Sequence, residues 1–300
     1  AEHFYNTILR AEPKNADANH NLGVLATSLK ATHRALILFE TALEVKPNVE
    51  TFWISYIDAL IKNNRLEDAE IASRKALDLK QDFIEVNFIL SAILIKRGEL
   101  VEAEAILKKI IEFKPDYAEA YYSLGVIQYK AARFIEAEAS YKSATKFKRD
   151  YIQAYNNLGV IQYKAGRFIE AEASVKKALD LKPDYAEGHY TLGNIFKISK
   201  RIDEASESYE RAIALKPNMN YLLGASLHAK MHQCRWGDLS QDLTKITKKI
   251  NNGEKILTPF ILNSLIDDPS LQRKSAEIYS KDKYPKSDIL PKLTNYQGHK

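Results

Sequence analysis

The chain has 300 residues and carries 44 Lys and Arg against 39 Asp and Glu, which gives a formal net charge of +5. This excess is too small to indicate a nucleic-acid or membrane binder, so neither kind of partner is expected. A single cysteine, Cys234, excludes an internal disulfide framework and a multi-cysteine zinc site. Eleven glycines and nine prolines are fewer than average, which favours helix over turn-rich structure.

The opening residues and the hydropathy pattern bear on cellular location. The chain begins AEHFYNTILR, without an initiator Met and without the basic and apolar segments of a secretion signal. No apolar run approaches the roughly 18 residues that cross a membrane. We therefore expect a cytoplasmic protein, and we interpret the chain as a fragment of a longer one.

Prolines recur with a period of 34 residues over most of the chain. They are spaced 34, 68, 68 and 34 residues apart, at Pro13, Pro47, Pro115, Pro183 and Pro217. At the two other positions of this period, residues 81 and 149, the chain has Gln81 and Arg149 in place of proline. A fixed period of this length indicates stacked supersecondary units. Residues 16–219 are thus predicted to be six repeats, which begin at Ala16, Glu50, Ile84, Ala118, Ile152 and Ala186.

Each repeat is predicted to be a hairpin of two amphipathic helices, because apolar residues recur at spacings of three and four. Small residues occupy fixed columns, which lets the helix axes approach closely. One column is alanine in all six repeats, at Ala35, Ala69, Ala103, Ala137, Ala171 and Ala205. Another is glycine in four repeats, at Gly23, Gly125, Gly159 and Gly193. The break between the two helices is predicted at Asn64, Gly98, Gly166 and Lys200.

The flanking segments complete the predicted organisation. Residues 1–15 place apolar side chains in second-helix columns and are predicted to be the second half of a truncated repeat. Residues 220–252 are predicted to form a degenerate capping hairpin, with Trp236 and Leu239 in second-helix columns. Residues 253–300 are predicted to be a linker helix and a polar tail. In that helix Asp268 is the expected N-cap, Pro269 opens the first turn, and the helix runs to about Tyr279.

The columns follow the order aromatic, Leu-Gly, Ala, aromatic, Ala and Pro, and they resemble the tetratricopeptide repeat pattern from about Ala1 to Pro217. The resemblance implies an all-α fold, a right-handed α-α superhelix or tetratricopeptide repeat solenoid, with capping and linker helices at its C-terminal end. Such a stack of hairpins lines its concave face with the first helix of every repeat. Protein or peptide segments are the expected partners on that face.

The predicted concave face is basic and aromatic. Its lysines recur in one column at Lys62, Lys96, Lys130 and Lys164, which suits an acidic or backbone-bound chain. The full set of predicted peptide-binding residues is Lys62, Lys96, Tyr122, Tyr129, Lys130, Asn156, Asn157, Tyr163, Lys164, Tyr190, Asn194 and Lys197. The alternative interpretation is that these lysines are solvated surface copied by duplication, since surface exposure is the usual state of lysine.

The sequence contains no recognisable catalytic motif. Its glycines never form G-x-G, and no phosphate-binding loop pattern occurs. His228 and His232 lie four residues apart with Cys234 nearby, but no carboxylate or second cysteine completes a metal-ligand set. We interpret these three residues as structural or incidental, and we expect no catalytic residue, metal or cofactor in this chain. Stoichiometric zinc would revive a catalytic hypothesis.

The segment after Pro217 carries a second resemblance. The sequence CRWGD at 234–238, the pair Pro259-Phe260, and Asp267-Asp268-Pro269 resemble bacterial relatives of the O-linked N-acetylglucosamine transferase and SPINDLY family. The resemblance implies that this chain is the substrate-recognition arm of a protein O-glycosyltransferase. The catalytic module, which uses a UDP-sugar, is missing from this chain and would follow residue 300. No donor-binding or catalytic residue is therefore carried over.

Two properties of that family bear on the predicted groove. Animal members line it with asparagines, whereas the matching column here has asparagine at only two of six positions, in the order Asn21, Ser55, Ile89, Ser123, Asn157 and Thr191. Animal members also dimerise through their repeats, so the resemblance implies a homodimer as a further partner. The alternative function is a stand-alone scaffold or adaptor with no linked enzyme.

Overall fold

The structure is a computed structural model that describes residues 1–235, 237 and 239–284. The chain divides into two compact units, Ala1–Ala154 and Tyr155–Lys300, which are described separately. All regular structure in the described residues is helical, with no strand among them. The predicted all-α repeat fold is therefore confirmed. None of the helices in this part of the chain has the length and apolar character needed to cross a bilayer.

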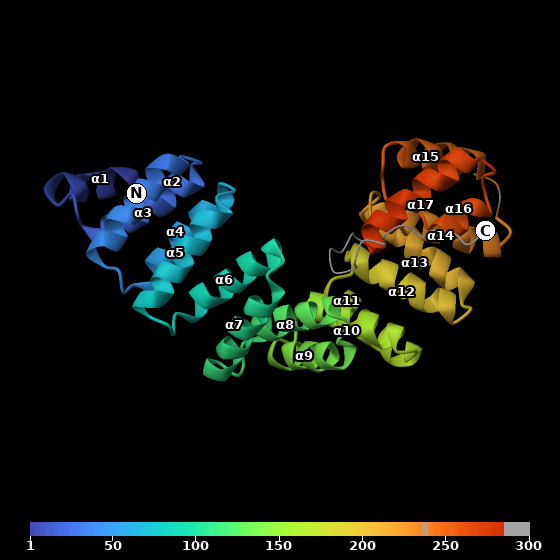
Figure 1. The fold of residues 1–300 in the computed structure, drawn as a ribbon, viewed down its shortest axis with the longest axis horizontal. Helices are drawn as coiled ribbons and strands as arrows, with labels where there is room; N and C mark the ends of the chain where they lie inside the picture. Colours follow the sequence, from blue (N-terminus) through green and yellow to red (C-terminus); the bar gives the residue numbers. More distant parts are fainter. Residues whose placement is uncertain (236, 238, 285–300) are drawn as a thin grey trace, which may run out of the picture. The chain divides into compact units, whose positions relative to one another are not determined.

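Successive helices pair as hairpins in the first unit (Figure 1). Its helices are α1 (Glu2–Ala11), α2 (Ala16–Ser28), α3 (Thr32–Val45), α4 (Glu50–Lys62), α5 (Leu66–Leu79), α6 (Ile84–Arg97), α7 (Leu100–Phe113), α8 (Ala118–Lys130) and α9 (Phe134–Phe147). The first helices α2, α4, α6 and α8 begin at the residues where the 34-residue period places the start of each repeat.

The second unit continues the hairpins and ends in a different arrangement of helices. Its helices are α10 (Ile152–Lys164), which begins at the junction, α11 (Phe168–Leu181), α12 (Ala186–Ile198), α13 (Ile202–Leu215), α14 (Leu222–His232), α15 (Leu239–Asn251), α16 (Pro259–Asn263) and α17 (Pro269–Lys283). Trp236, predicted in a second-helix column, and the predicted polar tail beyond Tyr284 lie outside the described residues.

The small-residue columns form the core of the hairpins. The six alanines of the invariant column are all fully buried. A Cβ added to Gly125 would lie 2.7 Å from Cε1 of Tyr141, and one added to Gly193 would lie 2.6 Å from the same atom of Tyr209. Glycine therefore makes room for a second-helix ring. This close approach of two helices is the packing that the small-residue columns predict.

In four repeats, a side-chain nitrogen near the start of the first helix ties that repeat to the preceding segment. Trp53 Nε1 donates a hydrogen bond to the Pro47 carbonyl oxygen at 2.7 Å, and His189 Nε2 donates to that of Pro183 at 2.8 Å. In other repeats the donor is an asparagine amide, Asn19 Nδ2 to Pro13 at 3.0 Å and Asn87 Nδ2 to Gln81 at 2.9 Å. These bonds satisfy a carbonyl oxygen that follows the end of the preceding second helix, where the helical ladder offers no donor.

The turn inside each hairpin uses one residue with positive φ, and the same column repeats it seven times. Its members are Lys30, Asn64, Gly98, Ala132, Gly166, Lys200 and Cys234, with φ between 56° and 88°. Left-handed backbone costs an L-residue about 1–2 kcal/mol, and glycine avoids that cost. Cys234 thus shows that the turn geometry of the repeats recurs directly after α14.

Two repeats provide a natural test of that cost, because residues 124–140 and 158–174 differ only at Ala132 and Gly166. We expect Ala132→Gly to raise the free energy of unfolding by about 1 kcal/mol, since alanine holds φ at 57° there. Gly166→Ala should lower it by a similar amount. Urea unfolding of both variants measures the two effects, and equal stability of all three proteins would contradict the explanation.

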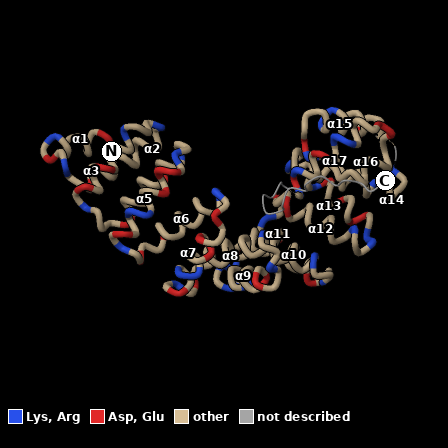
Figure 2. The backbone as a smooth tube through the Cα atoms, in the orientation of Figure 1, with Lys and Arg blue, Asp and Glu red and all other residues tan. Residues whose placement is uncertain are grey.

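Ion pairs repeat with the hairpins in both units. Arg133 Nη1 lies 3.0 Å from Glu104 in the first unit, and Arg201 Nη1 lies 2.6 Å from Glu172 in the second. In three hairpins, a lysine after the second helix pairs with an acid near the start of the first helix, as in Lys46–Asp17, Lys148–Glu119 and Lys216–Glu187. Both charges occur throughout the described parts of each unit (Figure 2).

Acid should weaken the Glu104–Arg133 pair in a defined pH range. Hydrogen bonds from Arg133 lower the pKa of Glu104 from 4.5 to about 2, although burial opposes this shift. The unfolded state therefore binds more protons between these values, and the stabilisation, complete above about pH 4.5, is lost as the pH falls toward 2. The difference in unfolding free energy between wild type and Glu104→Gln should shrink over this range. A difference independent of pH would contradict the assignment.

The C-terminal helices form their own hydrophobic core in the second unit. The core joins α14–α17 through Leu227, Ile246, Ile250, Ile256, Leu257, Leu262 and Leu271. The backbone amides of Tyr221 and Gly224 donate to the carbonyl oxygens of Lys255 and Ile256, at 2.7 and 3.1 Å. Asp268 accepts from the amides of Ser270 and Leu271, so it caps α17 as predicted. The helix continues to Lys283, beyond the predicted end near Tyr279.

Candidate functional site

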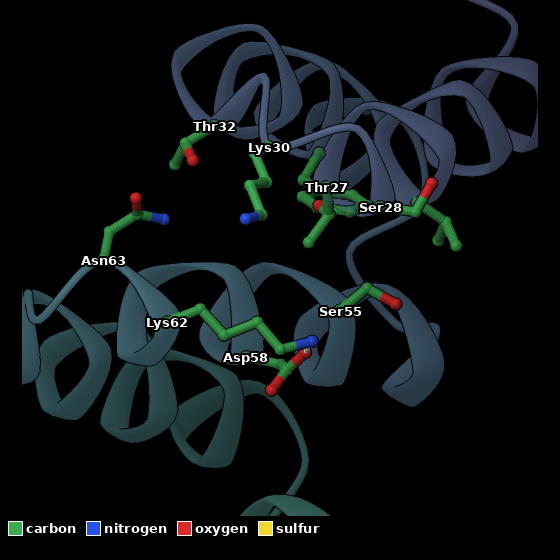
Figure 3. Close-up of a pocket in the computed structure, with 10 residues that line it drawn as sticks. Thr27, Ser28, Lys30, Thr32, Ser55, Asp58, Lys62 and Asn63 are labelled. Atoms are coloured by element: carbon green, nitrogen blue, oxygen red, sulfur yellow. Dashed lines mark ion pairs between the residues drawn. The ribbon is translucent and has the colours of Figure 1, made fainter.

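The candidate site lies on the inner face, which consists of the first-helix columns of Val24, Thr27 and Ser28 and their equivalents in later repeats. In the first unit this face is hollowed by a pocket of about 660 Å³. Figure 3 shows the pocket between the end of the first hairpin's α2, the start of α3, and α4. Its lining consists of Val24, Thr27, Ser28, Lys30, Thr32, Phe39, Ser55, Asp58, Lys62 and Asn63.

Lys62 is the predicted site residue that lines this pocket. Its Nζ lies 2.5 Å from Oδ2 of Asp58, one helical turn earlier on α4 (Figure 3). About half or more of each side chain is accessible to solvent, so the pair is worth little to stability. Within the pocket, the carboxylate of Asp58 thus compensates the positive charge of Lys62.

Lys30 is a pocket residue that the sequence analysis did not single out. It stands in the turn after α2 with φ at 59°, and Figure 3 shows its ammonium group extending into the pocket. The described residues offer it neither an ion-pair partner nor a hydrogen-bond acceptor for its ammonium group. Helix-column reasoning passed over Lys30 because it lies between two helices. The signal that could have found it is a charged residue in the turn column.

His20 supports one wall of the pocket. Its Nε2 lies 2.9 Å from Oγ of Ser55, and its ring stacks on Phe52 with centroids 4.4 Å apart. Burial lowers the pKa of His20 below its ordinary value, which favours the neutral form of the ring. His20 therefore fixes Ser55 without adding positive charge to the face.

The middle of the first unit presents Lys96 and Lys130 on the inner face. Both side chains are exposed, and neither has an ion-pair partner in the described part of the chain. The accompanying tyrosines are half-buried and also serve packing. Tyr122 contacts the rings of Tyr141 and Tyr151, at centroid distances of 5.8 and 4.9 Å, and Tyr129 meets Phe134 edge-on at 5.6 Å. Part of each ring is therefore committed to packing within the fold.

In the second unit, the predicted polar residues differ strongly in exposure. Asn156 is only 6% exposed, and its Oδ1 is buried without a hydrogen-bond partner. Asn157 is half-buried, and Lys164 is exposed but has a partner of its own. Asn194 accepts a hydrogen bond from the Tyr209 hydroxyl at 2.9 Å. Asn156 was predicted to lie on the exposed concave face, but the structure buries it inside the fold.

Lys197 and two tyrosines complete the predicted set in the second unit. Burial lowers the pKa of Lys197, and the described residues include no carboxylate that pairs with it. The Tyr163 ring packs on Phe168 at 6.0 Å, and the Tyr190 ring packs on Tyr209 at 6.1 Å. Both tyrosine rings therefore take part in the packing of their hairpins.

His228, His232 and Cys234 were considered above as possible metal ligands. The two imidazole rings lie 4.6 Å apart at their centroids, and Cys234 is exposed. Nδ1 of His228 is buried without a hydrogen-bond partner. Over residues 1–235, 237 and 239–284, no group of three His, Cys, Asp or Glu side chains is placed to hold a metal ion.

Sequence comparison assigns the repeats to one family. Three family models, each described as tetratricopeptide repeat, match the chain. The first matches residues 16–49, the second residues 60–132 and 94–161, and the third residues 150–218. Together they cover well over half of the 300 residues. No curated protein matches the chain.

Solved structures share the fold at low sequence identity. The chain is similar to YrrB, described as a tetratricopeptide repeat protein with an unusual peptide-binding site, with 20% identity and a TM-score of 0.51 over 63% of this chain and 97% of that one. PilF of Pseudomonas aeruginosa gives 16% identity and 0.61 over 73% and 96%. The Cut9–Hcn1 hetero-tetramer of the APC/C gives 15% and 0.62 over 75% of this chain and 45% of that one.

Proposed function

Because the chain belongs to the tetratricopeptide repeat proteins, we propose that it is a scaffold that holds segments of client polypeptides along its inner face. The observation that carries the proposal is the pocket of about 660 Å³ on that face, which first-helix residues of two successive repeats line. Such stacks of helical hairpins expose extended binding surfaces of this kind.

The inner face has the chemistry that an extended peptide requires. Lys96 and Lys130 offer ammonium groups, and the pocket contributes the hydroxyls of Thr27 and Ser55. If neighbouring hairpins are spaced by roughly 10 Å, and an extended chain advances by about 3.3 Å per residue, each repeat meets about three peptide residues. A client segment of about nine residues would thus contact three repeats.

Charge reversal on the two sides of the hairpins tests this proposal. Peptides selected from a display library for binding to the wild-type chain would be measured against two double variants by calorimetry. Lys96→Glu with Lys130→Glu alters the inner face, whereas Lys75→Glu with Lys146→Glu makes the same charge change on α5 and α9. We expect the inner variant to lose about tenfold or more in affinity, the equivalent of roughly 1.4 kcal/mol, and the control to lose little. Equal losses would overturn the proposal.

We further propose that the clients are substrates of an enzyme. In this proposal, the chain is the substrate-recognition arm of a protein O-glycosyltransferase similar to the O-linked N-acetylglucosamine transferases. It is supported by the resemblance of the residues after Pro217. The core of α14–α17 fits this role, because it gives the repeats a firm C-terminal end. Under this proposal, a polypeptide that joins this chain to the catalytic module should transfer N-acetylglucosamine from its UDP-sugar to Ser or Thr of a bound peptide. Binding without any transfer would favour the alternative, a stand-alone scaffold.

A further inference from the structure

We propose that the pocket between the first two repeats accepts the carboxylate of an acidic client side chain, and that Lys30 with Asn63 holds it. This inference rests on the proposed function and names the class of side chain that one part of the inner face selects. It concerns a turn lysine and a helix-end amide, neither of which belongs to the predicted lysine column.

Two nitrogen donors face each other across the pocket. Figure 3 shows the side-chain nitrogens of Lys30 and Asn63 pointing toward one another from opposite walls. Asn63 Nδ2 donates one hydrogen to the Ala59 carbonyl oxygen at 2.5 Å, and the amide has a second hydrogen to give. The Lys30 ammonium has three. Two converging donors leave a place between them that suits an oxygen acceptor.

The charges in the pocket favour an anion at that place. Its lining contains two ammonium groups and one carboxylate, those of Lys30, Lys62 and Asp58. Asp58 pairs with Lys62 at 2.5 Å, so the positive charge of Lys30 is left uncompensated. A carboxylate between Lys30 and Asn63 would balance the pocket and form charge-assisted hydrogen bonds, the stronger kind.

Two of the four hydroxyl groups that line the pocket, those of Thr27 and Ser28, do not compete for that anion. Thr27 Oγ1 already donates to the Gly23 carbonyl oxygen at 3.0 Å, and Ser28 Oγ donates to that of Leu25 at 2.7 Å. With their hydrogens committed, these oxygens act as acceptors. They therefore suit the backbone N–H groups of a client chain, while Lys30 and Asn63 provide the donors for its side chain.

The apolar part of the lining favours a side chain with an aliphatic stem. Val24 and Phe39 line the same pocket, and 660 Å³ is far more than one small anion fills. A glutamate places two methylene groups against such a surface and carries its carboxylate at the end. The combination of an apolar wall with one unpaired ammonium group thus points to an acidic peptide side chain, not to an inorganic ion.

The backbone fixes where the Lys30 side chain begins. Its φ is 59°, its amide donates to the Thr27 carbonyl oxygen at 3.1 Å, and the next amide, that of Ala31, donates to Ala26 at 2.9 Å. Lys200 occupies the same turn column in the sixth repeat, with φ at 61° and its amide 3.1 Å from the Lys197 carbonyl oxygen. Lys200 therefore provides a control of the same residue type in the same backbone conformation.

The test uses an inner-face peptide that contains glutamate, together with the same peptide carrying glutamine or phosphoserine at that position. Affinities for the wild type, Lys30→Met and Lys200→Met are measured by calorimetry, and circular dichroism checks that the variants fold. The wild type should prefer glutamate over glutamine by about five- to tenfold, as expected for a hydrogen-bonded charge near the surface. Lys30→Met should abolish this preference, and Lys200→Met should keep it.

Three results would overturn the inference: no preference in the wild type, a preference that Lys30→Met leaves intact, or phosphoserine binding at least tenfold tighter than glutamate. Failure of the proposed function is a separate outcome, because it appears as insensitivity of all peptide binding to Lys96→Glu with Lys130→Glu. A peptide that responds to that pair but not to Lys30→Met refutes the carboxylate pocket alone.

Discussion

Replacing Tyr141 by alanine is expected to lower the free energy of unfolding by about 3–5 kcal/mol, the range measured when a buried aromatic side chain is removed. Tyr141 is almost completely buried in α9. Its ring fills the space that Gly125 leaves open on α8 and lies 5.8 Å from the ring of Tyr122. The variant leaves a cavity between the two helices of one hairpin, which the small-residue columns hold at a fixed separation.

A double-mutant cycle shows whether Gly125 and Tyr141 act as a pair. Gly125→Ala alone should destabilise the chain, because the new Cβ meets the ring at 2.7 Å. In the Tyr141→Ala background the same change should cost much less, a coupling of about 1–3 kcal/mol. Ile135→Ala is the matched control, since Ile135 lies on the same helix and is 86% exposed. Additive effects of Gly125→Ala and Tyr141→Ala would contradict this account of the column.

Gly224→Val is expected to detach the C-terminal cap, at a cost of about 3 kcal/mol from overpacking and lost hydrogen bonds. A Cβ at residue 224 would lie 2.3 Å from Cβ of Leu257 and 2.8 Å from its Cα. Because a backbone atom is involved, the chain itself must move. The shift would break the hydrogen bond from the Gly224 amide to Ile256 and pull Leu257 out of the core of α14–α17.

Amide hydrogen exchange is the measurement suited to this variant, since it reports local opening. Exchange should speed up in α15 and α17 while protection in α2–α9 stays unchanged, because repeat arrays are held by nearest-neighbour contacts. Gly237→Val is the control, as nothing lies within 4 Å of a Cβ at that residue. Unchanged protection in α15 and α17 of the Gly224→Val chain would contradict the packing described for the cap.

The 34-residue period was enough to predict the helices of the repeats. Alanine and glycine columns exist because two helices approach closely, so the sequence carries the packing directly. The starts of α2, α4, α6, α8, α10 and α12 follow from that period alone. The period did not predict the short helix α16, which lies outside the repeats. It also did not predict the hydrogen bonds that hold Lys255 and Ile256 against α14, because these bonds join segments more than thirty residues apart.

The candidate site was only partly predictable, for reasons that the structure makes plain. Column reasoning selects residues by their angle around a helix, so it found Lys62 but passed over Lys30 in a turn. It also cannot tell how deeply a side chain lies. Asn156 and Asn157 are neighbours in sequence, yet Asn156 is buried and Asn157 is half-buried. Tyr122 shows the same limit, since its ring packs against Tyr141 and Tyr151.

The most direct test of the central claim, that clients bind along the first helices, is to map where a bound peptide lies. A selected peptide carrying a benzophenone side chain would be cross-linked to the chain and the attachment sites read by mass spectrometry. Cross-links should fall on inner-face residues of α2, α4, α6 and α8, such as Val24 and Val126. Cross-links confined to the exposed aliphatic side chains of the second helices, Val101 and Ile135, would contradict the claim.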